Sequence, residues 1–140
     1  MDKQELYEKW VDKVCQFIEC VGPEINCTSC AMQSKPVLDK SPQVVFLGYN
    51  AHEPFPYQEA NKERFYEGNP YFYTDREKWP VWGKLYAAMK WAKFTEPMED
   101  SNFVFMNAVY FGSQDIKGLK AKKGSAEIIN QCLDFSAEVI

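Results

Sequence analysis

The chain has 140 residues, of which 46% are hydrophobic, 26% charged and 16% aromatic. This predicts one globular domain over residues 1–140, because a disordered chain could not bury enough apolar surface to offset its ordering entropy. The net charge of −4 excludes the global positive charge that many nucleic-acid-binding proteins use. No apolar run reaches the roughly 20 residues of a membrane span, and the first residues lack the layout of a signal peptide, so we expect a cytoplasmic protein with no membrane partner.

The N-terminal residues carry an amphipathic helical pattern. Apolar residues recur at helical spacing from Asp2 to about Cys20. Gly22 and Pro23 then predict the end of this helix. A connector over residues 23–42 follows.

Two short apolar runs predict β-strands. Residues 44–47 lie between Pro42 and Gly48, and the second run covers 102–106. Both are continuous rather than alternating, which is typical of strands buried on both faces. The stretch between them, 50–79, is rich in proline and aromatic residues, and an irregular segment of this length is usually a functional loop.

The second half of the chain predicts two more helices. One begins at Pro80 and runs to about Lys93, and the other begins at Ser125 after a lysine-rich loop over 113–124. Helices that alternate with buried strands in this order indicate an α/β fold with a parallel sheet. The last helix reaches Ile140 without a stop signal, so we expect a domain that is incomplete at its C-terminus, although a short protein that pairs with a partner would show the same pattern.

Each predicted strand delivers an asparagine at its carboxyl end, the edge at which open α/β sheets bind ligands. Asn50 follows the first strand and Asn107 ends the second. An amide both donates and accepts hydrogen bonds, which suits the positioning of water or the reading of a base edge. The alternative is that both asparagines merely satisfy turn backbone.

The order of these motifs resembles the uracil-DNA glycosylase superfamily, particularly its iron-sulfur branch. A helix, a C-x-x-C connector, V-V-F-L-G-Y-N, an aromatic loop and F-V-F-M-N-A-V follow one another over residues 2–140. The resemblance implies a three-layer α/β/α fold and a DNA-repair hydrolase that flips a base out of DNA. Such an enzyme cleaves the N-glycosidic bond of uracil or a related damaged base. The superfamily's second catalytic motif, H-P-S, has no counterpart in these residues.

The resemblance gives roles to the residues after the first strand. Gly48 and Tyr49 open the superfamily's water-activating motif, and Asn50 falls on the residue that orients water toward an oxocarbenium-like sugar. Ala51 stands where the motif usually has proline. His52, the only histidine, would hydrogen-bond the departing base or a phosphate, the alternative being a solvated loop histidine.

The same resemblance makes Asn107 the reader of uracil. Its amide would donate to O4 and accept from N3–H, a pattern that cytosine does not offer. Phe72 would stack on the extruded base, with Tyr71 and Tyr73 as rivals, although aromatic residues in a loop are more often simply packed there.

Three cysteines match ligands of the branch's iron-sulfur cluster: Cys27, Cys30 and Cys132. The third ligand position holds Phe111, which cannot bind iron. We therefore expect no cofactor, unless a cysteine of the first helix substitutes; the alternative is that these are reduced core cysteines.

Two functions follow from the sequence. The first is a uracil-DNA glycosylase whose partner is DNA containing uracil or a damaged base. The second is a catalytically inactive homologue that acts as a nucleic-acid or protein binding module. Asn50 and Asn107 favour the enzyme, whereas Ala51 and Phe111 favour the inactive homologue. A metal or redox protein is less consistent with a C-x-x-C in a proline-flanked connector.

Overall fold

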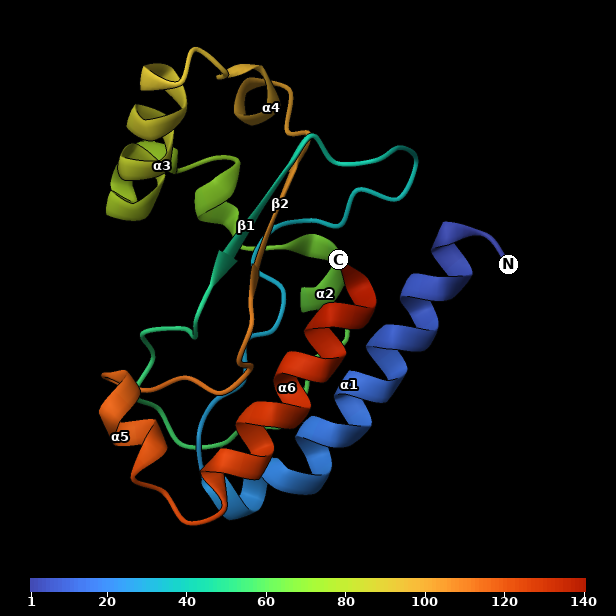
Figure 1. Cartoon of the computed structure of the whole chain (residues 1–140), viewed down its shortest axis with the longest axis vertical. Coiled ribbons are helices and arrows are strands. Elements are labelled where there is room, and N and C mark those ends of the chain that lie inside the picture. Colours follow the sequence, from blue (N-terminus) through green and yellow to red (C-terminus); the bar gives the residue numbers. More distant parts are fainter.

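The computed structural model describes all residues, 1–140, as helices arranged around a two-stranded parallel sheet (Figure 1). In chain order the elements are α1 (Lys3–Ile25), β1 (Val44–Gly48), α2 (Arg64–Glu67), the 3-10 turns η1 (Pro70–Phe72) and η2 (Arg76–Lys78), α3 (Pro80–Trp91), α4 (Glu96–Glu99), β2 (Phe103–Asn107), α5 (Ile116–Lys120) and α6 (Ser125–Val139). This mixture confirms the α/β character predicted from the sequence. None of the helices combines the length and apolarity needed to cross a bilayer.

Helix α1 is longer than the sequence predicts. The Asp2 carboxylate caps its first turn by accepting from the Glu5 N–H at 2.9 Å. The helix passes through Pro23, which costs it a backbone hydrogen bond. The extra turn buries Ile25 in the core, and Asn26 then ends the helix in a left-handed conformation, with φ 51°. The predicted stop at Gly22 and Pro23 was wrong for this reason.

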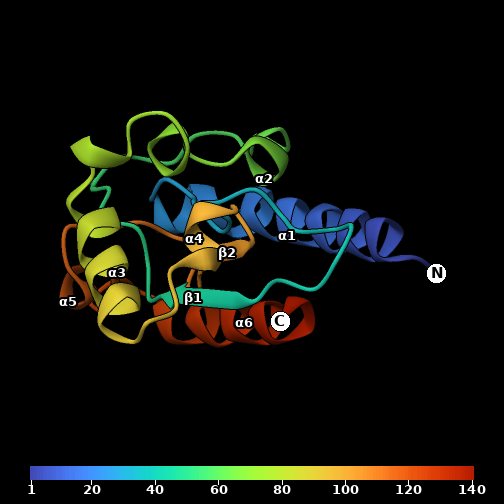
Figure 2. The ribbon, with the colours of Figure 1, turned by 90° about the horizontal axis from the view of Figure 1, so that it is seen from above.

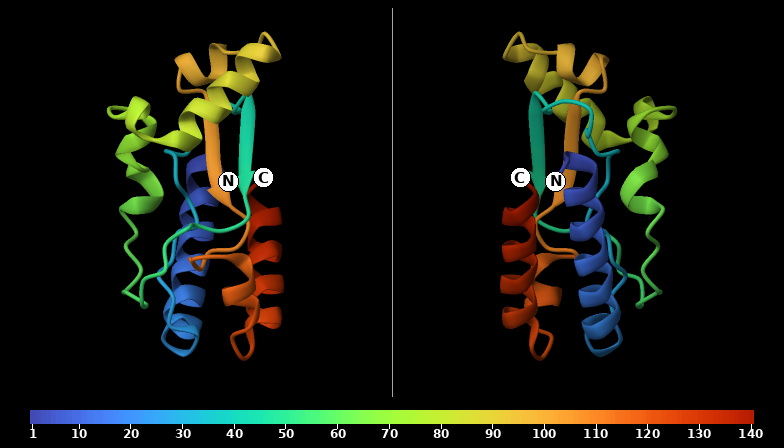
Figure 3. Two further views of the ribbon diagram at one scale, coloured as in Figure 1. Left: turned by 90° about the vertical axis from the view of Figure 1, so that its left-hand side faces the viewer. Right: turned by 90° about the vertical axis from the view of Figure 1, so that its right-hand side faces the viewer.

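Helices α1 and α6 run side by side in opposite directions (Figures 1 and 3). The Trp10 indole N–H donates to the Phe135 carbonyl at 2.7 Å, and Lys13 pairs with Glu138 at 3.0 Å on the surface. Apolar residues of both helices share the larger core cluster with Met106 of β2. The helical patterns correctly predicted a helix at each end of the chain, and the structure adds that the two helices pack together.

The strands pair in parallel, with Val44 opposite Phe103 and Gly48 opposite Asn107. Strand β2 is almost fully buried, as predicted. Strand β1 is not buried on both faces, since Val45 and Leu47 are 40% and 53% exposed. The prediction was wrong here because β1 has only one neighbouring strand and no element covers these two side chains.

The connector after α1 lies along β2 rather than forming a plain loop. It makes antiparallel bridges from Ser29 to Phe111 and from Met32 to Met106. The Asn107 N–H donates to the Ala31 carbonyl at 2.8 Å, and the next N–H along the chain donates to β1. Because successive N–H groups of a strand point to opposite sides, β2 lies between β1 and the connector.

A second core cluster lies on the other face of the sheet, where α3 and α4 cover it near the start of both strands (Figure 1). It consists of Phe72, Trp82, Met89, Met98, Phe103 and Phe105. The predicted helix over 80–93 corresponds to α3. The predicted loops are partly helical: 50–79 contains α2 and both 3-10 turns, and 113–124 contains α5. Figure 2 shows the α2 segment on one side of the molecule and α6 on the other, with α1 and β2 between them.

Candidate functional site

The parallel pairing brings Asn50 and Asn107 to the same end of the sheet. The segments that follow the strands are joined by backbone hydrogen bonds, from Val109 N–H to the Tyr49 carbonyl at 2.7 Å and from Ser113 N–H to the Ala51 carbonyl at 3.1 Å. The two segments therefore lie side by side beyond the carboxyl ends of the strands, the end of the sheet at which the sequence predicted both asparagines.

Asn50 is half-buried, and its amide is held in one orientation. Its Nδ2 donates to the Phe111 carbonyl at 3.0 Å and to the Ser113 hydroxyl at 2.8 Å. A carbonyl oxygen only accepts, so the nitrogen must face Phe111. Asn50 Oδ1 makes no hydrogen bond to the protein. Asn102 Oδ1 is the one fully buried polar side-chain atom without a partner, so Asn50 Oδ1 is accessible to solvent. Asn50 thus presents a fixed, accessible hydrogen-bond acceptor.

Asn107 is in a different state, because it is only 1% exposed and both ends of its amide are occupied. Nδ2 donates to the Cys30 carbonyl at 2.7 Å, and Oδ1 accepts from Gln33 Nε2 at 3.0 Å. A Cβ on Gly48 would lie 2.9 Å from this Oδ1, so glycine is needed for the close approach of β1. Asn107 therefore hydrogen-bonds to a backbone carbonyl of the connector. This agrees with the alternative interpretation, in which the asparagines satisfy backbone groups.

The other residues after β1 face solvent or the core edge. His52 is exposed, and its ring makes no hydrogen bond to the protein. Tyr49 packs partly against the larger core, and Lys120 Nζ lies 5.9 Å from the centroid of its ring. Lys120 belongs to α5, which lies near the carboxyl edge of the sheet (Figure 1). The edge therefore combines the free Asn50 oxygen with a nearby cation.

The ring predicted to stack on a base is inside the protein. Phe72 is 0% exposed and packs against Trp79, at 4.4 Å between ring centroids, and against Phe103. A stacking role needs an open ring face, which Phe72 does not have here. Burial is favoured because η1 turns this residue toward the second core cluster.

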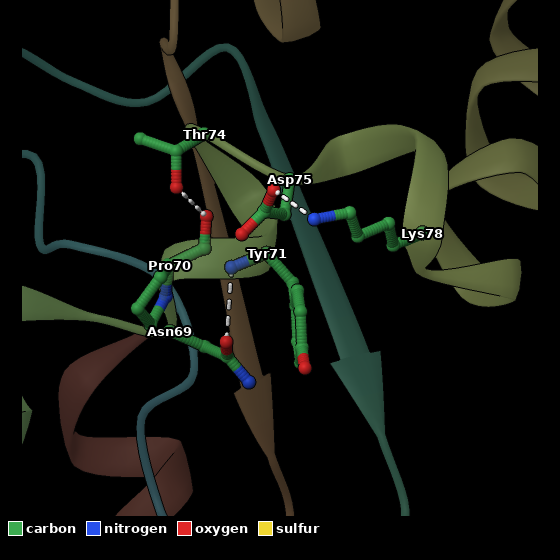
Figure 4. Close-up of polar contacts among 6 residues, drawn as sticks. All are labelled: Asn69, Pro70, Tyr71, Thr74, Asp75 and Lys78. Carbon is green, nitrogen blue, oxygen red and sulfur yellow. Dashed lines mark hydrogen bonds and ion pairs between the residues drawn. The ribbon is translucent and has the colours of Figure 1, made fainter.

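The neighbouring Tyr71 is exposed, and Asn69 holds its backbone N–H (Figure 4). Asn69 caps η1 by accepting from the Tyr71 N–H at 3.0 Å, and the Tyr71 side chain is 44% exposed. Tyr73 is half-buried, with the Lys35 ammonium 5.0 Å from its ring centroid. Of the three candidate rings, Tyr71 is the most exposed.

The cysteines that match cluster ligands do not meet at one place. No three His, Cys, Asp or Glu side chains are grouped so that they could hold a metal ion. Burial raises the pKa of the Cys30 and Cys132 thiols to about 12, with Glu53 adding to the effect at Cys30. Phe111 fills the core instead of the third ligand position. The residues as arranged do not fit an iron-sulfur cluster, and the absence of a cofactor stays a prediction.

Two partners of the site were missed in the sequence. Ser113 anchors the Asn50 amide, and Gln33 occupies the Asn107 oxygen. Ser113 offered a weak signal, a hydroxyl in the segment after the second strand. Gln33 offered none, because its role depends on the connector lying along β2.

The chain matches no family model, no curated protein and no solved structure. The two main cavities, of about 200 and 490 Å³, are not lined by Asn50, His52, Phe72 or Asn107.

Proposed function

We propose that this chain is a uracil-DNA-glycosylase-like domain that hydrolyses the N-glycosidic bond of uracil or a related damaged base in DNA. The proposal includes a three-layer α/β/α arrangement and a cytoplasmic location. The observation that carries it is Asn50, whose amide is anchored by two hydrogen bonds while its carbonyl oxygen faces solvent at the carboxyl edge.

Asn50 would act by holding the attacking water. Cleavage of an N-glycosidic bond passes through an oxocarbenium-like sugar, which a weak nucleophile can attack if it is correctly placed. The free Oδ1 accepts one hydrogen of the water and directs a lone pair at the sugar. Because the Phe111 carbonyl and the Ser113 hydroxyl already fix the amide, no reorganisation is needed at the moment of reaction.

His52 and the α5 lysines supply the groups that DNA would need. His52 is exposed two residues beyond Asn50, where its ring can hydrogen-bond a departing base anion. Lys117 and Lys120 are exposed on α5 near the same edge. They would contact backbone phosphates despite the negative net charge of the chain.

Asn107 favours the second candidate, a catalytically inactive homologue that binds nucleic acid or a protein. To read uracil, the Asn107 amide would have to give up its bond to the Cys30 carbonyl or to Gln33. Phe72 would likewise have to leave the core. Both residues are thus held in structural roles in the unbound protein.

The experiment that separates the candidates measures uracil release and DNA binding together. The full-length protein is incubated with a labelled single-stranded DNA that contains one uracil, because extruding a base costs least in single-stranded DNA. Alkali then cleaves the strand at abasic sites, which reports uracil release. We expect release from this strand. Binding without release would support the inactive homologue, and neither binding nor release would reject both the glycosylase and a nucleic-acid-binding homologue.

A further inference from the structure

A cavity of about 200 Å³ lies beside the C-x-x-C connector, and Asn50 does not line it. Its walls come from residues 28–32 of the connector and from 58–65, the segment that leads into α2. We propose that this cavity binds a small oxyanion, a phosphate or carboxylate group, through Arg64 and Thr28. The proposal is independent of the glycosylase function.

Thr28 is the buried element of this site. The residue is only 8% exposed, yet its hydroxyl makes no hydrogen bond to any protein group. Asn102 Oδ1 is the one fully buried polar side-chain atom without a hydrogen-bond partner. The Thr28 hydroxyl has no partner either, so it is not fully buried and a small molecule can reach it. Thr28 lines the cavity, and a hydroxyl that has no protein partner is available to a ligand bound there.

Arg64 supplies the positive charge. The chain has two arginines, and they differ in their contacts. Arg76 donates to the Phe72 carbonyl and to Ser101, and its guanidinium lies over the Trp82 ring. Arg64 forms no ion pair and no side-chain hydrogen bond, although it lines the cavity. Its planar fork of N–H donors matches the oxygens of a phosphate or carboxylate.

The thiol in the cavity does not oppose an anion. Burial, together with Glu53, raises the pKa of Cys30 to about 12, so the thiol is neutral near neutral pH. The remaining polar lining is Ser29, Gln58 and Asn61, all able to donate hydrogen bonds, with Phe65 among the apolar residues of the wall. Glu59 is the one carboxylate of the lining, and Glu53 also lies near enough to act on Cys30.

Glu59 allows a test of whether the bound ion is negatively or positively charged. An anion in the cavity is attracted by Arg64 and repelled by Glu59, whereas a cation would respond in the opposite way. Both side chains are exposed and neither forms an ion pair, so their substitution should leave the fold intact.

The test is isothermal titration calorimetry at constant ionic strength with inorganic phosphate, acetate and thymidine monophosphate as probes. We expect Arg64→Gln to weaken binding by at least about tenfold and Glu59→Gln to strengthen it about threefold. Thr28→Val, which removes only the hydroxyl, should weaken binding about fivefold. Lys78→Gln, an exposed charge on η2, is the matched control and should change nothing.

The probes distinguish the possible sources of the anion. Tighter binding of thymidine monophosphate than of phosphate indicates a nucleotide, equal binding indicates the free anion, and preference for acetate indicates a carboxylate. The proposal is overturned if no probe binds, if Arg64→Gln has no effect, or if the two charge variants change affinity in the reverse directions. None of these outcomes depends on uracil release.

Discussion

Two asparagines at the carboxyl ends of neighbouring strands have different surroundings: Asn107 is the last residue of β2, and Asn50 lies two residues beyond β1. The Asn50 carbonyl oxygen makes no hydrogen bond to the protein, whereas both the nitrogen and the oxygen of the Asn107 amide are hydrogen-bonded to the connector. The sequence predicted that both asparagines lie at the carboxyl edge of the sheet, because the end of each apolar run indicates where a strand ends. It could not predict which amide stays free, since that depends on Gln33 and on a connector that folds back along β2.

Asn107→Asp tests the structural role of the buried amide. An ionised carboxylate cannot donate to the Cys30 carbonyl, so we expect the free energy of unfolding to fall by about 2 to 3 kcal/mol. A protonated carboxyl can donate there, so the loss should shrink in acid. Urea unfolding measures both effects. Asn130→Asp, on the exposed face of α6, is the control and should stay within about 0.5 kcal/mol of the wild type; an equal loss in the two variants would contradict the role given to Asn107.

At the scale of elements, helical periodicity predicted α1, α3 and α6, and continuous apolar runs predicted both strands, because each of these patterns lies within a single element. Long-range contacts decided the rest. Pro23 did not end α1, since Ile25 gains burial beyond it. Val45 and Leu47 stay exposed, because the sequence of a strand does not reveal how many neighbours it has. Phe72 was expected to stack on an extruded base, but it packs in the core against Trp79 and residues of α3 and β2.

Two helical glycines give a matched test of packing. A Cβ on Gly22 would overlap the ring of Tyr57, whereas a Cβ on Gly83 would meet nothing within 4 Å. We expect Gly22→Ala to lower the free energy of unfolding by at least about 1 kcal/mol, through overpacking. Gly83→Ala should raise it by about 0.5 to 1 kcal/mol, because alanine is the better helix former.

Combining Gly22→Ala with Tyr57→Ala isolates the contact. With the ring removed, the added methyl group should no longer destabilise α1. If Gly22→Ala remains equally harmful in that background, the packing of Tyr57 against α1 is not its cause. Thermal unfolding of the wild type, the two single variants and the double variant provides the comparison.

At the scale of the whole molecule, buried neutral groups link stability to pH. Burial raises the pKa of the Cys30 and Cys132 thiols to about 12, and it also raises the pKa of the Tyr7 and Tyr110 phenols. An unfolded thiol has a pKa of about 8.5. Each thiol therefore stabilises the fold fully below this value, and the stabilisation is lost as the pH rises toward about 12.

We accordingly expect the free energy of unfolding to fall above about pH 8.5, by up to about 1.4 kcal/mol per pH unit for each thiol. Cys30→Ala should make this decline less steep, because one titrating group is gone. Urea titrations at increasing pH test the prediction. An unchanged stability into strong alkali would mean that these thiols ionise freely in the folded protein.

The central claim is that Asn50 positions water for base excision. The most direct measurement is the single-turnover rate of uracil release by the full-length Asn50→Ala variant, taken together with its affinity for the same single strand. Asn130→Ala serves as the control, and Asn50→Asp keeps an oxygen that can hold water. We predict that Asn50→Ala slows release by at least about 100-fold while affinity changes less than about twofold, with Asn50→Asp between the two. A release rate equal to that of the wild type, or a loss of affinity as large as the loss of rate, would contradict this role for Asn50.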